Sequence, residues 1–165
     1  MALTYEPIAT NTLSSATNSV SFTSIPSTYT DLVLVVSAWH ATASSQVALR
    51  FNSDSGGNYS YTRLLGSGTA ATSERDVNKS TIFLGYINST ATSPNFICSI
   101  QDYSNSTTYK TTFNRFNTIG NWGNMGATVG NWRSTAAITS MAITPADGGN
   151  FASGSIFTLF GIQAA

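Results

Sequence analysis

The chain has 165 residues, a length typical of a single domain that buries a hydrophobic core without disulfides or metals. Its seven basic and seven acidic residues balance, and charged residues make up only 8% of the sequence, against about 25% in ordinary soluble domains. This composition argues against electrostatic binding to nucleic acid or anionic lipid. No apolar run approaches the roughly 18 residues of a membrane span, so we expect no membrane partner either.

Stretches of strand length, rich in apolar and β-branched residues, recur between clusters of Gly, Ser, Asn, Asp and Pro. No segment shows the sustained amphipathic stripe with caps that predicts a helix. The predicted strands, in chain order, span residues 19–25, 31–39, 46–52, 59–66, 80–87, 95–103, 109–117, 137–144 and 155–163. Strands at this spacing predict an all-β fold, and we expect an antiparallel β-sandwich of about eight strands.

The domain organisation is simple, because no linker or block of charge divides the chain. Residues 1–19 predict a short amino-terminal arm without the features of a signal sequence, and residues 20–165 predict one domain. The run from Leu32 to Val36 is apolar at every position, so both faces of that strand should be covered. We expect this strand to lie in the centre of a sheet or at a subunit contact.

The stretch LRFNSDSGGNYSYTRLLG, residues 49–66, places Asn52 and Asp54 with the spacing of the first half of a calcium-binding loop. Such a loop needs a bidentate glutamate at its twelfth position. Counting from Asn52, that position is Arg63, and a cation there rules out this kind of calcium site. We predict a hairpin turn instead, with a strand resuming at Tyr59 and the two glycines of the turn at positive φ.

Candidate catalytic residues are few. His40 is the sole histidine, and no G-x-S-x-G motif marks a nucleophile for it to activate. Glu74 and Asp76 are the closest pair of acids, and they lie in a charged segment that we predict to be a solvated loop. Cys98, the single cysteine, lies in the apolar run NFICSI and should be a small buried hydrophobe. We expect no enzyme activity, no cofactor and no structural metal.

The triplet GNW begins at residue 120 and again at residue 130, inside a segment rich in glycine and asparagine that predicts a long hairpin or loop. Trp122 and Trp132 allow two interpretations. Both tryptophans could anchor the loop to the core, since large aromatic side chains contribute most where they are buried. Alternatively, one of them is exposed as a stacking platform for a sugar ring, with Arg133 as part of that binding site.

Several segments taken together carry a resemblance to a known family: SIPSTYTDLVLVVSAW, ALRFNSDSGGNYSYTRLLG, IQDYSNSTTYKT, NWRSTAAITSMAI and FASGSIFTLFGI. They resemble a jelly-roll domain of tailed-phage structural proteins, whose members are tail-fibre or head-decoration (cement) components. The likeness extends from roughly Thr4 to Gln163, and its most particular part is LRFNSDSGGNYSY with the closing FTLFGI. It implies a jelly-roll sandwich in which SDSGGN is a turn of the scaffold, and it brings no catalytic residues.

The family resemblance leaves two functions open. The first is a capsid decoration protein, sitting on the outer surface of the virion and bridging subunits of the major capsid protein shell. The second is a tail-fibre or receptor-binding head domain that binds a host surface glycan. Fibre proteins usually carry a long stalk, whereas only about twenty residues precede SFTSIP, which favours decoration. The 41% apolar content, with few charges, further predicts a homotrimer.

Overall fold

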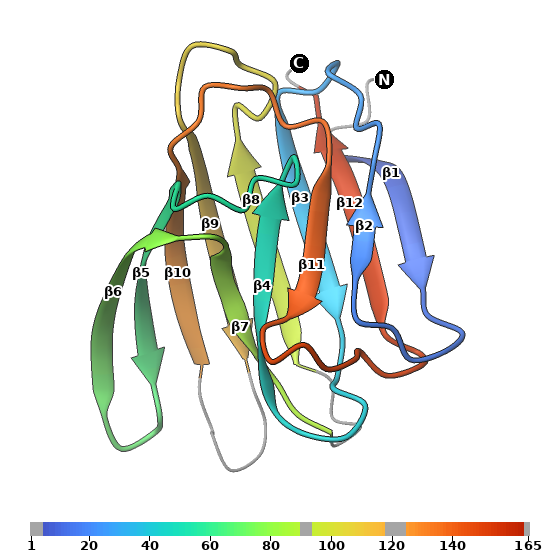
Figure 1. Ribbon diagram of the computed structural model, residues 1–165, viewed down its shortest axis with the longest axis vertical. Coiled ribbons are helices and arrows are strands. Elements are labelled where there is room, and N and C mark those ends of the chain that lie inside the picture. The colour runs from blue at the N-terminus through green and yellow to red at the C-terminus, as the bar shows by residue number, and fades with distance from the viewer. Residues whose placement is uncertain (1–4, 90–93, 118–124, 164–165) are drawn as a thin grey trace.

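The computed structural model describes residues 5–89, 94–117 and 125–163, which form an antiparallel β-sandwich without a helix in those ranges (Figure 1). The all-β prediction is therefore confirmed. The strands are β1 (Tyr5–Thr12), β2 (Val20–Phe22), β3 (Asp31–Ser37), β4 (Ser45–Phe51), β5 (Tyr59–Gly66), β6 (Ala71–Lys79), β7 (Ile82–Ile87), β8 (Asn95–Gln101), β9 (Lys110–Asn117), β10 (Met125–Trp132), β11 (Met141–Pro145) and β12 (Ile156–Ile162).

The strands form two layers of unequal size. The larger sheet has the order β1-β12-β3-β8-β9-β10-β5-β6, and the smaller sheet has the order β2-β11-β4-β7. In Figure 1 the smaller sheet lies in front of part of the larger sheet, and β5 and β6 extend beyond it on the left. One face of the larger sheet is thus partly covered by the smaller sheet, and β6 is exposed along almost its whole length.

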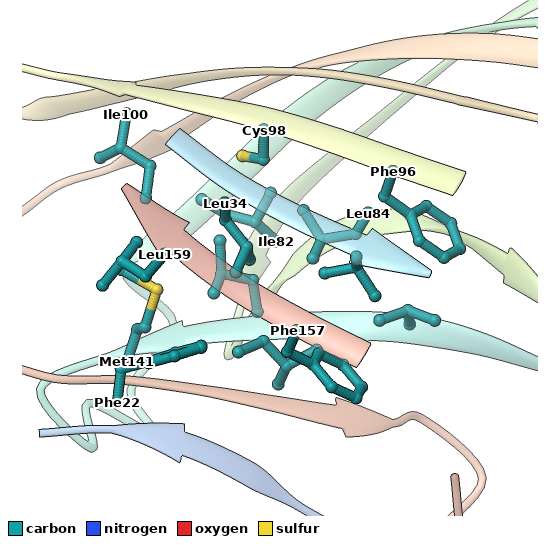
Figure 2. Packing of buried hydrophobic residues seen from close by; sticks show 14 of the residues in the cluster. Phe22, Leu34, Ile82, Leu84, Phe96, Cys98, Ile100, Met141, Phe157 and Leu159 are labelled. Atoms are coloured by element: carbon teal, nitrogen blue, oxygen red, sulfur yellow. The ribbon is translucent and has the colours of Figure 1, made fainter. Parts of the chain in front are cut away.

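The core lies between the two sheets because successive side chains of a strand point to opposite faces. In β4, for example, Val47, Leu49 and Phe51 are fully buried, whereas Arg50 lies on the outer face. Figure 2 shows the contact between layers, where side chains of the larger sheet meet those of the smaller one; the labelled residues are Phe22, Leu34, Ile82, Leu84, Phe96, Cys98, Ile100, Met141, Phe157 and Leu159.

Two expectations about the interior are confirmed. The strand that contains Leu32 to Val36 is central, since β3 pairs with β12 on one side and with β8 on the other. Its outward-facing Val33 is buried as well as its core-facing residues. Cys98 lies fully buried in the core, and this burial raises the pKa of its thiol to about 12. A thiol in that environment behaves as a hydrophobic group.

The predicted number of strands was too low, because the described residues contain twelve. Residues 5–12, expected to belong to a short amino-terminal arm, form β1, which pairs with β12 from Tyr5 opposite Ile162 to Thr12 opposite Ile156. The charged segment expected to be a loop contains β6, and the glycine-rich segment contains β10. The jelly-roll topology itself stays a prediction.

Strand β10 contains glycines because neighbouring groups approach its backbone closely. A Cβ atom at Gly126 would lie 2.6 Å from the Leu64 carbonyl oxygen and 2.7 Å from Cζ of Phe116. A Cβ atom at Gly130 would lie 2.5 Å from Oγ1 of Thr112. Glycine is usually unfavourable inside a strand, and here it permits this close packing.

Candidate interaction surface

The outer face of the larger sheet is the most unusual surface of the molecule. It lies on the side away from the smaller sheet, and its strands β9, β10 and β5 carry exposed apolar side chains. The exposed fractions are 50% for Phe113, 51% for Val129, 59% for Leu64 and 67% for Met125. We call these residues the outer apolar patch; a cluster of this kind on a soluble domain commonly marks an interaction site.

Strand register places the residues of the outer apolar patch next to one another. Val129 is the partner of Phe113 on β9, and Ala127 is the partner of Leu64 on β5. Residues opposite each other on antiparallel strands have Cβ atoms about 5 Å apart. The patch is therefore continuous over three neighbouring strands, although its residues are far apart in sequence. Met125, at the start of β10, forms its end beside Gly66.

Shallow depressions of two kinds lie on and beside this patch. Leu64, Gly66, Met125 and Ala127 line an apolar one at one end of β5 and β10. A polar one is lined by hydroxyl, amide and guanidinium groups at the other end, from Ser60, Thr62, Arg75, Thr111 and Asn131. The surface thus offers apolar contact at one end and hydrogen-bonding groups at the other.

Strand β9 departs in part from the usual distribution of polar and apolar residues, although its inner-facing Phe116 is a buried core residue. Its inward-facing Lys110, Thr112 and Asn114 are fully buried, whereas Phe113 on the opposite face is half exposed. Buried polar groups and exposed large apolar groups are the informative exceptions in a soluble domain. Such local conflicts with the folding pattern are expected at functional surfaces, and here the conflict lies in the strand that carries the outer apolar patch.

Two arginines beside the outer apolar patch, Arg75 on β6 and Arg115 on β9, make no hydrogen bond or ion pair within the described ranges. Arg63 differs, because its Nε donates to Glu74 at 2.8 Å and its guanidinium lies 4.7 Å from the centre of the Phe83 ring. The Arg50 Nε likewise donates to the Ser80 carbonyl at 3.3 Å. Arg75 and Arg115 are therefore available to a partner.

Trp132 does not offer a stacking platform for a sugar. It is only 2% exposed, and its indole Nε1 donates to Oδ2 of Asp54 at 2.7 Å. It also stacks on Tyr59 with ring centres 6.2 Å apart. The interpretation in which Trp132 anchors the chain to the core is therefore the correct one. Trp122 lies outside the described residues.

Arg133 is held against the turn that precedes β5. Its guanidinium donates to the Gly57 carbonyl and, at 2.8 Å, to Oδ1 of Asn78. Its own backbone N–H donates to the Asn58 carbonyl at 2.8 Å. Arg133 thus connects the turn to the end of β6, which is a structural arrangement and not an open binding site.

The stretch around Asp54 is a turn, as predicted, but it is not a hairpin. It connects β4 of the smaller sheet to β5 of the larger one. The residues with positive φ are Asn52 at 48° and Ser53 at 57°, and not the two glycines. Asn52 tolerates this conformation because its side chain hydrogen-bonds nearby backbone: its Oδ1 accepts from the N–H of Thr139 at 2.9 Å.

The Asp54 carboxylate is saturated by protein donors. Besides Trp132, it accepts from Nδ2 of Asn58 at 2.9 Å and from the N–H of Gly56 at 2.9 Å. The bond from Trp132 is the largest of the causes that lower the pKa of Asp54, followed by the bond from Asn58. In the described parts of the chain, no three His, Cys, Asp or Glu side chains come together in a way that could hold a metal ion.

His40 is buried beside a carboxylate that sequence gave no reason to place there. Its Nε2 lies 3.3 Å from Oδ2 of Asp147, and its Nδ1 accepts backbone N–H bonds from Thr42 at 3.2 Å and Ala43 at 2.9 Å. Ser45 donates to the other oxygen of Asp147 at 2.9 Å. A nucleophile–base pair needs the serine to contact the histidine, whereas here the aspartate lies between them. The Nδ1 of His40 is occupied by backbone donors, and its Nε2 approaches Asp147 without forming a hydrogen bond.

Glu74 and Asp76 lie on strand β6 and not in a solvated loop. Glu74 pairs with Arg63 across the strands, and Asp76 lies 2.9 Å from Nζ of Lys79. The bond from Lys79 is the largest of the causes that lower the pKa of Asp76. Each carboxylate is therefore matched to a cation. Charged side chains of this kind also protect an exposed edge strand from pairing with other chains.

No family model matches the chain, and no curated protein matches it in sequence. A search of solved structures finds a protein of unknown function from Shewanella oneidensis MR-1 with 11% identity and a TM-score of 0.23. The match covers 98% of this chain and 77% of that one, but similarity at this level carries no conclusion about fold or function. In the described residues, no helix is long and apolar enough to cross a membrane.

Proposed function

We propose that the chain is a structural protein of a tailed phage, a capsid decoration (cement) protein of jelly-roll type that forms homotrimers on the outer surface of the head. The observation that carries this proposal is the outer apolar patch with its two unpaired arginines, on a broad sheet face that the smaller sheet does not cover. A decoration protein needs such a surface, because it acts by binding. The sequence resemblance supplies the phage setting.

The mechanism would be additive binding. Each trimer would contact several shell subunits, so that the loss of one contact leaves the others engaged at a high effective concentration. Because the trimer would bind the assembled shell and not dispersed subunits, it would stabilise the shell by mass action. This mechanism uses no cofactor, no metal and no catalytic group.

A receptor-binding role at the tail is the second candidate, and the polar depression favours it. The free hydroxyl, amide and guanidinium groups of Thr62, Asn131 and Arg75 could hydrogen-bond a host glycan, with Phe113 nearby on the same face. The burial of Trp132 removes one of the residues expected to stack on a sugar.

Particles that lack the protein separate the two roles. We expect such heads to break at a lower temperature or under milder osmotic shock than complete heads, while still adsorbing to host cells. Heads of normal stability that fail to adsorb would contradict decoration and assign the protein to receptor binding. Static light scattering of the isolated protein checks the trimer: a single-chain mass at micromolar concentration would contradict it.

A further inference from the structure

The outer face near β10 has an uneven charge distribution that points to its partner. Arg75 and Arg115 both lie on this face, beside Thr62 and Ala127 in the strand register. The outward-facing carboxylate of Asp31 lies on β3, and its Oδ1 already accepts from the N–H of Asp102 at 2.7 Å. Asp76 lines the polar depression together with Arg75, but it is already paired with Lys79, and Glu74 is paired with Arg63. Among the described residues of β9, β10, β5 and β6, the face therefore presents two unpaired cations and no unpaired carboxylate.

The two arginines lie on either side of the apolar residues. Arg115 is on β9 and Arg75 is on β6, so three strand spacings and two residues along the strands separate their backbones, or about 16 Å. Leu64 and Val129 lie between them on β5 and β10. A partner that complements this face needs apolar side chains in the centre and carboxylates on both sides.

We propose that this face, formed by β9, β10, β5 and β6, docks a second protein whose surface places carboxylates opposite Arg75 and Arg115 around an apolar centre. The inference rests on the proposed function, in which that second protein is the shell subunit. It identifies the side of the domain that faces the capsid, with the outer surface of the smaller sheet directed away from it.

The composition of the face favours a protein over other partners. Phe, Met and Arg are enriched in protein interfaces, whereas Lys, Asp and Glu are depleted there, and the outward-facing residues of β9, β10 and β5 follow both trends. Two arginines are too few for a nucleic acid site, which needs many cations. Exposed Leu64, Met125 and Val129 offer aliphatic contact, whereas a sugar-binding platform is built from aromatic rings.

A second copy presenting the same face is a poorer match than an acidic partner. Face-to-face packing of two identical surfaces would bring four arginines together without a carboxylate to pair with them. Like charges at an interface disfavour the wrong partner, whereas arginine and carboxylate pairs fix the register of the right one. Contacts between copies in the proposed trimer would therefore use another surface.

The experiment measures sedimentation of the purified protein with capsids from which the native protein has been stripped. The test variant is the double charge reversal R75E/R115E. The control is R50E, which reverses one arginine on the outer side of the smaller sheet. Thermal melting verifies that both variants are folded. We expect R50E to bind like wild type and R75E/R115E to bind at least tenfold more weakly.

The outcomes separate the two proposals. Wild-type binding that R75E/R115E retains in full would overturn this docking face and leave the decoration function standing. Absence of wild-type binding to stripped capsids would overturn the decoration function, and the shell as partner of this face with it. Loss of host-cell binding by R75E/R115E, without any effect on capsids, would assign the face to a receptor and equally contradict the inference.

Discussion

Strands β3 and β9 belong to the same sheet, with only β8 between them, yet they distribute polar and apolar residues differently. β3 buries Leu32, Leu34 and Val36 on its inner face and Val33 on its outer face. β9 buries Phe116 on its inner face together with three polar or charged side chains, and it exposes Phe113 on its outer face. β3 therefore contributes mainly to the hydrophobic core. β9 buries fewer apolar side chains and leaves Phe113 available for contact with a partner.

The inner face of β9 accommodates Asn114 because that residue adjoins β7, an edge strand of the smaller sheet. The Asn114 side chain donates through Nδ2 to the backbone carbonyl of Leu84 on that edge. Buried backbone groups require partners, and an edge strand inside a sandwich leaves some without a neighbouring strand. A polar side chain from the facing sheet supplies the missing hydrogen bond.

The largest expected effect is a truncation in β3. Leu34→Ala should lower the free energy of unfolding by about 2–5 kcal/mol, because it removes a fully buried side chain and leaves a cavity. Chemical denaturation measures this loss. The matched change in the outer apolar patch, Leu64→Ala, should alter stability by no more than about 0.5 kcal/mol. Equal losses for the two leucines would erase the distinction between the core and the outer face.

The next effect concerns the edge of β7. Asn114→Ala should cost about 1–3 kcal/mol, since it leaves the buried Leu84 carbonyl without the hydrogen bond from Asn114. Hydrogen exchange of β7 amides should rise along with the loss in unfolding free energy. Unchanged stability would mean that the polar inner face of β9 has no structural role.

Asp54→Asn should destabilise the protein by about 1–2 kcal/mol at neutral pH, because hydrogen bonds to a charged acceptor become bonds to a neutral one. The folded-state pKa of Asp54 is lowered, first by Trp132 and then by Asn58, so its contribution is complete above the unfolded pKa of about 3.9. It is lost as the pH falls from there through the folded pKa.

The difference in stability between wild type and Asp54→Asn should therefore shrink below about pH 4, as measured by denaturant titrations across the acid range. Asp102→Asn is the matched control. Asp102 is exposed and its Oδ2 accepts a hydrogen bond from Nδ2 of Asn105 at 3.5 Å, so only a small change in stability is expected. If the difference in stability between wild type and Asp54→Asn grew as the pH fell, this result would contradict the proposed role of the carboxylate.

The smallest effect has the opposite sign. Thr112 is fully buried and its Oγ1 has no hydrogen-bond partner among the described residues. Thr112→Val keeps the shape and removes the hydroxyl, so it should stabilise the protein by up to about 1 kcal/mol. Thr111→Val, on the other face of the same strand, serves as the control and should be nearly neutral. A loss of stability in Thr112→Val would show that the hydroxyl is paired.

Strands were predicted best where an apolar pattern is bounded by residues that favour turns. Strand β5 has the predicted bounds, and the turn before it was expected from its glycine, asparagine and aspartate residues. Strand β6 was missed because four of its residues are charged, which an edge strand exposed on both faces allows. Strand β10 was missed because its glycines are more typical of a loop. The close contacts that require Gly126 and Gly130 form only when the strands and sheets are packed together, so the sequence does not reveal them.

The candidate surface was less predictable than the fold. Phe113, Val129 and Leu64 come together through the pairing of β10 with both β9 and β5, and β10 was not among the expected strands. The link from His40 to Asp147 likewise depends on the fold, since more than one hundred residues of sequence separate them. Local patterns report which side chains are apolar; they do not report which of them share an uncovered face.

The most direct test of the contrast between folding and contact surfaces uses one double variant, Phe113→Ser with Met125→Ser, in two measurements. We predict that its free energy of unfolding stays within about 0.5 kcal/mol of wild type, since both side chains are at least half exposed. Its binding to stripped capsids should fall at least tenfold. A variant that binds capsids like wild type, or that unfolds as easily as Leu34→Ala, would contradict the assignment of the outer apolar patch as the surface for contact.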